Sequence, residues 1–287
     1  MNLPAFLILL MIFTVGPFSC QKAPQGDDAP RPRIVSYSPA LTGILFDLGL
    51  GGHVVGVTSH TPMPAGQSRP IVGDAFSVNT EAILAVRPDV VMTQVSPSRF
   101  AALARLVPEI RIEPFTIETL QDVKSAAVRV AEIAGRGELG RRAGEEFQTR
   151  LDRLEQGLLD RPRPRVLFLT DFEIMGSAGA GTFIDQLITA AGGQNVAGKY
   201  TGWVTLTVEG IISAEPDVII CQVPSSGQER VRRFWGDLDD IPAVRDGRVY
   251  IISDDSWTIP GLHLAGFAEK LARMIQGGQL DGGPTDG

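Results

Sequence analysis

The 287-residue chain has few cysteines, few histidines and few aromatic residues. Two cysteines cannot form the framework of a disulfide scaffold, and three histidines exclude most proteins that have several metal sites. Positive charge is also in deficit: the formal net charge is −7, whereas nucleic-acid binding usually needs a basic surface that neutralises phosphates. Apolar residues make up 44% of the chain, which allows a packed core and excludes wholesale disorder. At roughly 100–200 residues per domain, the length predicts two domains or one large one.

The longest apolar run lies at the start of the chain and predicts export. It covers residues 3–15 (LPAFLILLMIFTV), which is too short for the helix of about 20 residues that crosses a bilayer. We expect a signal peptide over residues 1–19, a lipidated Cys20 and a flexible, proline-rich tether over residues 20–32. The protein would then be periplasmic or at the cell surface, in contact with the membrane through its lipid anchor only. The second cysteine, Cys221, lies in an apolar run and is expected to be a buried free thiol.

Two segments that lie 128 residues apart are similar, and they predict two related lobes. Residues 81–95 read EAILAVRPDVVMTQV and residues 209–223 read EGIISAEPDVIICQV, with seven of fifteen positions identical. In each copy an N-capping residue, Asn79 or Thr207, precedes a short helix whose first turn carries the repeated glutamate. A proline ends each helix, because the residue before proline avoids the right-handed helical region, and a buried strand follows.

Strands alternate with helices in both halves, so we expect an α/β fold with a parallel-type sheet in each of two lobes. The expected strands are residues 34–37, 54–58, 90–93, 111–115, 166–169, 218–221 and 249–253. Glycine pairs at 51–52 and 192–193 are expected to provide left-handed caps at helix ends. Apolar residues recur every three or four positions from Leu139 to Leu158, which predicts one long backbone helix that joins the lobes and limits their movement. The expected organisation is an N-terminal lobe over residues 33–135, a linking helix over 136–160, a C-terminal lobe over 161–277 and a disordered tail over 278–287.

Six segments in this order resemble the class III periplasmic substrate-binding proteins of ABC importers, which bind cobalamin, haem and iron–siderophore complexes. The segments are RIVSYSPALTGILFDLG, VVGVTSHTPMP, VGDAFSVNTEAILAVRPDVV, GSAGAGTFIDQLITAAGGQNVAG, GWVTLTVEGIISAEPDVII and IPAVRDGRVYIIS. The resemblance runs from about Arg33 to Gly277 and is closest to the vitamin B12-binding proteins. It implies a ligand cleft between the lobes and a monomeric binding component without enzyme activity or cofactor. The ligand would be a metal chelate, with cobalamin favoured over haem or a ferric siderophore, and it would be delivered to the permease of an ABC importer with its ATPase subunits.

The resemblance also implies roles for individual residues. Glu81 and Glu209 match the family's glutamates that dock onto arginines of the permease. The ligand-binding positions that it implies are His60, Phe76, Met175, Trp203, Trp257, His263 and Tyr37. Aromatic faces suit a flat, mostly apolar macrocycle, so Phe76 and Trp203 would clamp the ligand from both lobes. A histidine, either His60 or His263, could supply an axial ligand to the metal of the chelate, and so could the tyrosine at position 37.

Two alternatives remain open from the residues alone. The first is a zinc or manganese receptor of an ABC importer, for which His53, His60 and His263 could supply three nitrogen ligands. The second is an enzyme that processes a nucleotide or a glycoside. The glycine-rich loop over residues 176–181 has the spacing G-x-x-G-x-G and no following lysine, so it does not match a phosphate-binding loop. The repeated glutamates at the starts of their helices are poorly placed to act as a glycosidase acid and nucleophile.

Overall fold

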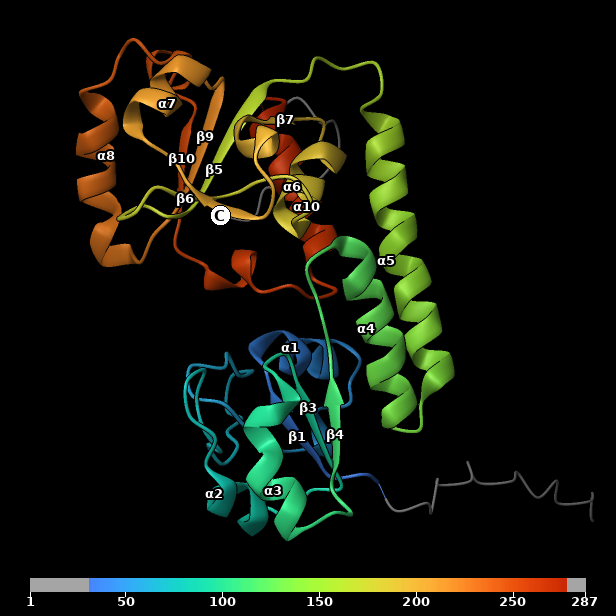
Figure 1. The fold of residues 1–287 in the computed structure, drawn as a ribbon. Coiled ribbons are helices and arrows are strands. Elements are labelled where there is room, and N and C mark those ends of the chain that lie inside the picture. The colour runs from blue at the N-terminus through green and yellow to red at the C-terminus, as the bar shows by residue number, and fades with distance from the viewer. Residues whose placement is uncertain (1–30, 278–287) are drawn as a thin grey trace, which may run out of the picture. The chain divides into compact units, whose positions relative to one another are not determined.

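A four-stranded parallel sheet forms the centre of the first lobe (Figure 1). Its strand order is β2-β1-β3-β4, with β1 at Ile34–Tyr37, β2 at Val54–Val57, β3 at Val90–Thr93 and β4 at Arg111–Pro114. The helices of this lobe are α1 (Pro39–Asp47), α2 (Thr80–Ala85) and α3 (Ala101–Leu106). Every residue of β1 and β3 is buried, as expected for inner strands of a parallel sheet covered on both faces. The computed structural model describes residues 31–277, so the expected signal peptide, Cys20 and the tail over 278–287 lie outside the described residues.

The second lobe has a mixed sheet of six strands in the order β10-β9-β5-β6-β8, with β7 pairing beside β5. Its strands are β5 (Arg165–Asp171), β6 (Gly176–Ala178), β7 (Gln194–Asn195), β8 (Trp203–Thr205), β9 (Val218–Gln222) and β10 (Val249–Ile252). Its helices are α6 (Phe183–Ala190), α7 (Val208–Ala214), α8 (Gln228–Gly236), α9 (Pro242–Arg245) and α10 (Leu264–Ile275). Short 3₁₀ turns lie at Gly51–His53, Pro97–Phe100, Val196–Lys199, Ser225–Gly227 and Asp255–Thr258.

The parallel-type sheet expected for this lobe is extended by two further strands, of which only β6 runs against the others. Strand β6 pairs antiparallel with both β5 and β8, so the sheet is mixed and not wholly of the parallel type. The glycine-rich loop makes this edge possible: a Cβ on Gly179 would lie 2.4 Å from the carbonyl oxygen of Tyr200. Its glycines therefore serve close backbone pairing in the sheet, and Gly181 adopts a φ of +85° at its end.

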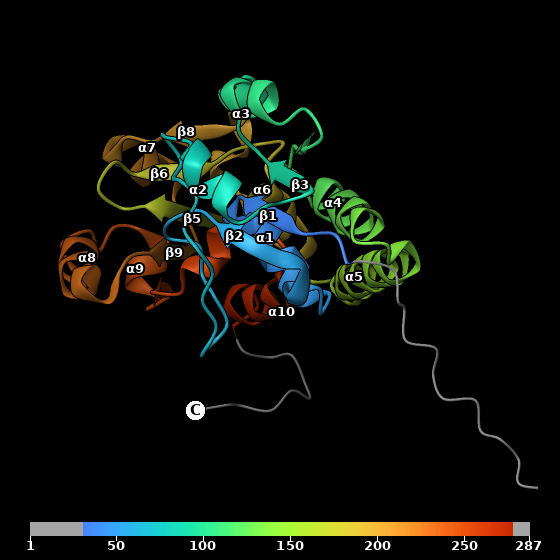
Figure 2. The same ribbon diagram turned by 90° about the horizontal axis from the view of Figure 1, so that it is seen from below.

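The chain passes from the first sheet to the second through a pair of helices. Helix α4 (Leu120–Ile133) follows β4, and α5 (Gly137–Gly157) leads to β5. The two helices lie side by side in both views (Figures 1 and 2). They approach closely at Gly140, where a Cβ would lie 2.6 Å from the Cβ of Ala131. The linking helix expected over residues 136–160 is present as α5, and α4 packs against its first part only, while α5 continues beyond α4 toward the second lobe. None of the helices at residues 31–277 is long and apolar enough to cross a membrane.

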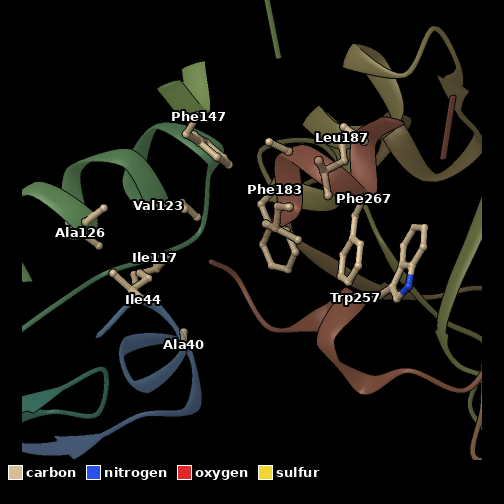
Figure 3. Packing of buried hydrophobic residues seen from close by; sticks show 14 of the residues in the cluster. Ala40, Ile44, Ile117, Val123, Ala126, Phe147, Phe183, Leu187, Trp257 and Phe267 are labelled. Carbon is tan, nitrogen blue, oxygen red and sulfur yellow. The ribbon is translucent and has the colours of Figure 1, made fainter. Parts of the chain in front are cut away.

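One hydrophobic cluster contains residues of both lobes and of the helical pair. Figure 3 shows Ile44 of the first lobe beside Ile117, and Phe183 of the second lobe near Phe267. Because the same cluster includes α1, α5 and α10, movement of one lobe against the other would disturb packed apolar contacts. A second cluster lies under α8 and includes Cys221.

The predicted buried thiol is confirmed. Cys221 is fully buried and free, and the indole Nε1 of Trp235 donates to its Sγ at 3.2 Å. Burial raises the pKa of this thiol to about 12, although the indole donor acts in the opposite direction. The thiol therefore stays protonated at physiological pH and is unreactive while the protein is folded.

The two repeated segments fold alike. Asn79 and Thr207 cap α2 and α7 through their side chains, as predicted. Each helix ends before its proline at a residue with positive φ: Arg87 at +43° and Glu215 at +42°. The residue before each proline therefore leaves the helical region for the left-handed region and does not become extended.

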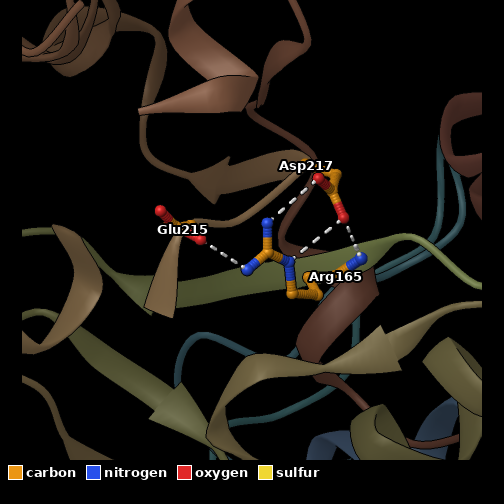
Figure 4. A network of polar contacts seen from close by, with 3 residues as sticks. All are labelled: Arg165, Glu215 and Asp217. Carbon is orange, nitrogen blue, oxygen red and sulfur yellow. Dashed lines mark hydrogen bonds and ion pairs between the residues drawn. The ribbon is translucent and has the colours of Figure 1, made fainter. Parts of the chain in front are cut away.

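The repeated aspartates tie each repeat to the first strand of its own lobe. Asp89 Oδ2 accepts from the backbone N–H of Arg33 at 2.7 Å, and Asp217 Oδ2 accepts from that of Arg165, also at 2.7 Å. Figure 4 shows that the Arg165 side chain also reaches Asp217 and Glu215. Burial raises the pKa of Asp217, but the hydrogen bonds from Arg165 outweigh it, so the net shift is downward.

The glycine caps agree with expectation in one lobe only. Gly192 has a φ of +78° and follows α6 as predicted. In the first lobe the left-handed residue is Gly49, with a φ of +70°, and the expected pair Gly51-Gly52 lies in a 3₁₀ turn instead. Gly51 is required there for space, because a Cβ would lie 2.2 Å from the ring of Phe46.

Candidate functional site

Each lobe has a pocket where its parallel strands end. The first has a volume of about 410 Å³ and lies at the carboxyl ends of β1 and β3, beside the loops that carry His60 and Phe76. The second has a volume of about 340 Å³ and lies at the carboxyl ends of β5 and β9, around Gln222 and Asp255. Ligands of open α/β sheets bind outside the carboxyl ends of the strands, so these two pockets form the candidate ligand site.

A larger pocket, about 630 Å³, lies at the opposite end of the second sheet. It is lined by residues near the amino end of β5, among them Arg165 and Lys199. Arg165 is already engaged by Asp217 and Glu215, and the pocket is far along the strands from their carboxyl ends. The two pockets at the carboxyl ends therefore remain the candidate ligand site.

Phe76 projects from the first pocket on a tightly held loop. The residue is 88% exposed, which is unusual for a phenylalanine. The Asp74 carboxylate accepts from the backbone N–H groups of Phe76 and Ser77, each at 2.7 Å. These hydrogen bonds hold the pKa of Asp74 below its usual value.

Two further side chains, those of Tyr37 and Arg99, hold the same loop by hydrogen bonds to its carbonyl groups. The Tyr37 hydroxyl donates to the carbonyl oxygens of Asp74 and Ser77, at 2.7 and 2.5 Å. The Arg99 guanidinium donates to the carbonyl oxygens of Ala75, at 2.7 Å, and of Phe76. Burial, followed by the Asp74 charge, raises the pKa of Tyr37, so its hydroxyl remains a donor. An exposed ring on an ordered loop is prepared for binding, because little freedom remains to be lost when a ligand covers it.

Tyr37 therefore supports the loop that carries Phe76. It lines the first pocket but is only 2% exposed, and its hydroxyl is occupied by the loop carbonyls. His60 lies at the rim of the same pocket, exposed and with a φ of +60°. Its Nδ1 lies 3.3 Å from Ser59 Oγ, and its Nε2 has no partner in the described part of the chain. Of the expected axial ligands, His60 is thus the one with an available nitrogen.

Trp203, the aromatic residue that the second lobe was expected to contribute to the ligand site, packs partly against its own lobe. Trp203 lies on β8 and is 49% exposed. Its ring packs edge-on against Phe183 at 6.0 Å between centroids. Met175, also expected at the cleft, has a φ of +49° and packs against the core cluster of the second lobe.

The structure buries Trp257 and leaves His263 half-buried. Trp257 is 4% exposed and stacks on Phe267 at 4.5 Å, with 6° between the ring planes (Figure 3). His263 Nε2 lies 3.1 Å from the carbonyl oxygen of Ser256, and its Nδ1 lies 3.7 Å from Asp47 Oδ2. Both nitrogens of His263 therefore already have neighbours, and a ligand role for either residue would require rearrangement.

The pKa of His263 reflects these neighbours. Burial of the ring lowers the pKa, but Asp47 and the backbone carbonyls of Ser256 and Ile259 raise it by more. The net shift is upward, which favours the protonated ring. The contact with Asp47 links the second lobe to the end of α1 in the first.

The three histidines do not gather. His53 is 8% exposed, with its Nδ1 3.1 Å from the carbonyl oxygen of Pro32, and the other two lie at the sites already described. Within residues 31–277 no group of three or more His, Cys, Asp or Glu side chains is arranged to hold a metal ion. Nothing in this part of the chain supports the zinc or manganese alternative.

The repeated glutamates are exposed in the first turns of their helices. Glu81 lies in α2 and Glu209 in α7, each two residues after its N-cap. Neither carboxylate has an ion-pair partner among the residues that the structure describes. Both are therefore available to a cationic partner, as the family resemblance implies.

Sequence reasoning missed several residues of the site. Asp74 and Arg99 hold the Phe76 loop, and no local pattern distinguishes them from surface charges. Gln94 and Gln222 line the two pockets and are identical positions of the repeat. The presence of the same polar residue at the end of a buried strand in both copies of the repeat is the sequence signal that could have indicated these two pocket residues.

The chain matches the family described as "Periplasmic binding protein" over residues 34–256. It is 28% identical over 257 residues to the "Uncharacterized ABC transporter substrate-binding lipoprotein YvrC" of Bacillus subtilis (strain 168), covering 85% of this chain and 79% of that protein. It is 23% identical over 233 residues to the "Vitamin B12-binding protein" of Vibrio campbellii (strain ATCC BAA-1116), covering 79% and 83% of the two chains.

Solved structures agree on the fold. The periplasmic heme-binding protein RhuT from Roseiflexus sp. RS-1, in apo form, superposes with a TM-score of 0.72 at 25% identity, covering 87% of this chain and 99% of that one. The periplasmic vitamin B12-binding protein BtuF of Vibrio cholerae superposes with a TM-score of 0.71 at 20% identity, covering 87% and 98%. The predicted fold, two α/β lobes of the class III type, is confirmed.

Proposed function

The chain belongs to the periplasmic binding protein family, and from this premise we propose that it captures a metal chelate, cobalamin in the first place, for an ABC importer. The family consists of binding proteins rather than enzymes, so neither enzyme alternative is retained. Haem and ferric siderophores are the next candidates. Relatives with B12-binding and heme-binding names support this class of ligand.

The observation that carries the proposal is the exposed Phe76 ring on its fastened loop, at a pocket where parallel strands end. A flat chelate presents a broad apolar face, and stacking against a ring that is already ordered gains contact with little loss of freedom. Trp203 offers a second, half-exposed ring from the other lobe. His60, with an available Nε2, is the proposed axial ligand if the metal of the chelate is coordinated by the protein.

We further propose that Glu81 and Glu209 dock the loaded protein onto cationic residues of the permease. Their exposure and their equivalent places in the repeat support this role. The expected ATPase subunits would act on the permease, and the binding protein would remain a monomer.

Export is supported by the family, and a relative named as a lipoprotein supports lipidation of Cys20. Labelled palmitate should be incorporated into the full chain and not into Cys20→Ser; equal labelling of both would contradict the anchor.

A visible-absorbance titration tests the main proposal. Purified protein is titrated with cyanocobalamin, haemin and a ferric siderophore, and the metal-chelate bands are followed. We expect a saturable spectral change with at least one of them and the largest affinity for cyanocobalamin. Absence of binding for all three, confirmed by equilibrium dialysis, would refute the proposed ligand class. His60→Ala should alter the bound spectrum only if this residue ligates the metal.

A further inference from the structure

We infer that the pocket of the second lobe selects a ligand that presents N–H donors and carries no carboxylates. This inference rests on the proposed function, because it takes the ligand to be a chelate held at the carboxyl ends of the strands. It narrows that function to chelates whose rim is amide-like and uncharged. Two independent features of the second pocket carry it: an unpartnered buried acceptor and an excess of carboxylates.

The unpartnered acceptor is revealed by comparing the two lobes. Tyr37 pairs with Thr93 in the first sheet, and Leu169 pairs with Cys221 in the second. The residues that follow these pairs are therefore equivalent: Ser38 and Gln94 in one lobe correspond to Thr170 and Gln222 in the other. Gln94 directly follows β3 and Gln222 is the last residue of β9, and the hydrogen-bond partners of these two equivalent glutamines differ.

In the first lobe the glutamine oxygen is satisfied. The Ser38 hydroxyl donates to Gln94 Oε1. In the second lobe the Thr170 hydroxyl donates instead to the carbonyl oxygen of Gly176, at 3.3 Å. This carbonyl belongs to β6, the antiparallel strand that the second sheet has in addition.

In the second lobe the amide nitrogen of Gln222 has a hydrogen-bond partner and its amide oxygen has none. Gln222 is 8% exposed, and its Nε2 donates to Asp255 Oδ1 at 3.3 Å. A carboxylate only accepts, so this contact determines which end of the amide is nitrogen. Gln222 Oε1 is buried and has no donor among residues 31–277. A buried acceptor without a donor is destabilising, and an N–H that enters this pocket supplies the missing partner.

The charges around the pocket point to the same kind of ligand. Asp171, Glu173 and Asp255 line it with exposed carboxylates. Arg230, the one cationic residue among those lining the two pockets, is paired with Glu173. At the second pocket a ligand carboxylate would therefore meet like charge without an available cation, whereas a rim of amide N–H groups would find acceptors. The first pocket differs, because its carboxylate Asp74 lies on the loop that the Arg99 guanidinium also holds.

Cyanocobalamin and haemin test the inference because both are flat metal chelates. The first has a rim of primary amides, and the second carries two propionates. We expect the wild-type protein to bind haemin at least about tenfold more weakly than cyanocobalamin at low salt. Added salt should strengthen haemin binding by screening the repulsion, with little effect on cyanocobalamin.

Variants separate the two features. Gln222→Met keeps the side-chain volume and removes the amide, and it should weaken cyanocobalamin about tenfold while haemin changes less than twofold. Asp171→Asn with Asp255→Asn should tighten haemin about three- to tenfold, because two like charges are removed. The matched control is Glu229→Gln with Asp237→Asn, which makes the same change in net charge on two exposed residues outside the pocket, one in the first turn of α8 and one directly after its end. Urea unfolding of each variant checks that the fold is retained.

The outcomes distinguish this inference from the function on which it rests. If the wild-type protein binds neither chelate, the proposed function fails, and the inference fails with it. If it binds haemin as tightly as cyanocobalamin, or if the control pair changes haemin affinity as much as the pocket pair does, the ligand class stands and the inference is overturned. If Gln222→Met unfolds, Gln222→Glu replaces it: the added carboxylate should weaken haemin by repulsion, while cyanocobalamin keeps an acceptor for its amide N–H and should lose much less affinity.

Discussion

Replacing Phe76 with alanine removes an exposed ring whose loss should be felt in binding and not in stability. A phenylalanine side chain offers about 150–250 Å² to a partner. The residue is 88% exposed, so a flat ligand that stacks on one face would cover about 90 Å² of it. At about 25 cal/mol per Å², the lost contact is worth about 2.2 kcal/mol, or a weakening of affinity of about 40-fold.

The assay measures both quantities for the same variants. Dissociation constants come from the absorbance titration, and the free energy of unfolding comes from urea denaturation. Phe76→Ala should leave the free energy of unfolding within about 0.5 kcal/mol of the wild type, as for other exposed substitutions. Leu106→Ala is the matched control, because Leu106 is also apolar and 65% exposed, but it lies on α3 outside the pocket. Trp203→Ala should lose both affinity and stability, since its ring also packs on Phe183.

A change of less than threefold in the dissociation constant of Phe76→Ala would refute the stacking role. Such a result would mean that the ligand does not cover this ring, despite the loop that holds it. The stacking role would also be refuted if Phe76→Ala lost no more affinity than the control variant Leu106→Ala. If Phe76→Ala instead destabilised the protein strongly, the ring would have a packing role that its exposure contradicts.

Three further predictions follow from the contacts described. Arg99→Met should weaken ligand binding about fivefold by loosening the Phe76 loop, and unchanged affinity in the titration would contradict this account. Glu81→Arg with Glu209→Arg should abolish uptake by cells while the purified protein keeps its affinity within twofold; a loss of affinity would contradict the docking role. His263 has a raised pKa in the folded state, so its pairing with Asp47 stabilises fully below the unfolded pKa of about 6.5 and is lost as pH rises through the folded pKa. Asp47→Asn should therefore lower the free energy of unfolding at pH 5.5 by about 0.5–1 kcal/mol more than at pH 9, and equal losses at both would exclude the pair.

Much of the fold was predictable because its signals are local. The strand at Ile34–Tyr37 and the caps Asn79 and Thr207 were found from short patterns, since β-branched runs and capping residues act within a few positions of themselves. The repeat extended these patterns from one lobe to the other. The antiparallel strand β6 was missed because its glycines match several loop types, and only the distant Tyr200 backbone shows that they permit strand pairing.

The candidate site was less predictable, because it depends on which side chains the fold leaves accessible. Trp257 and Phe76 are both aromatic residues outside the longer helices and strands, yet one is 4% exposed and the other 88%. Stacking of Trp257 on Phe267 decides its place, and Phe267 is on a helix ten residues further along the chain. Arg99 contacts the Phe76 loop across 23 positions of sequence, a distance at which a single sequence carries no pairing signal.

Two pairs of identical residues in the repeat, the aspartates and the glutamines, have different explanations. Asp89 and Asp217 are the same residue with the same partner, the backbone of the first strand in their own lobe, so the fold alone explains why both are aspartate. Gln94 and Gln222 are also the same residue, but only Gln94 has a donor for its oxygen within its lobe. A shared structural role therefore accounts for the aspartates and does not account for the second glutamine. Where equal residues at equivalent places have unequal partners, the unmatched polar atom marks where a molecule from outside the chain is to bind.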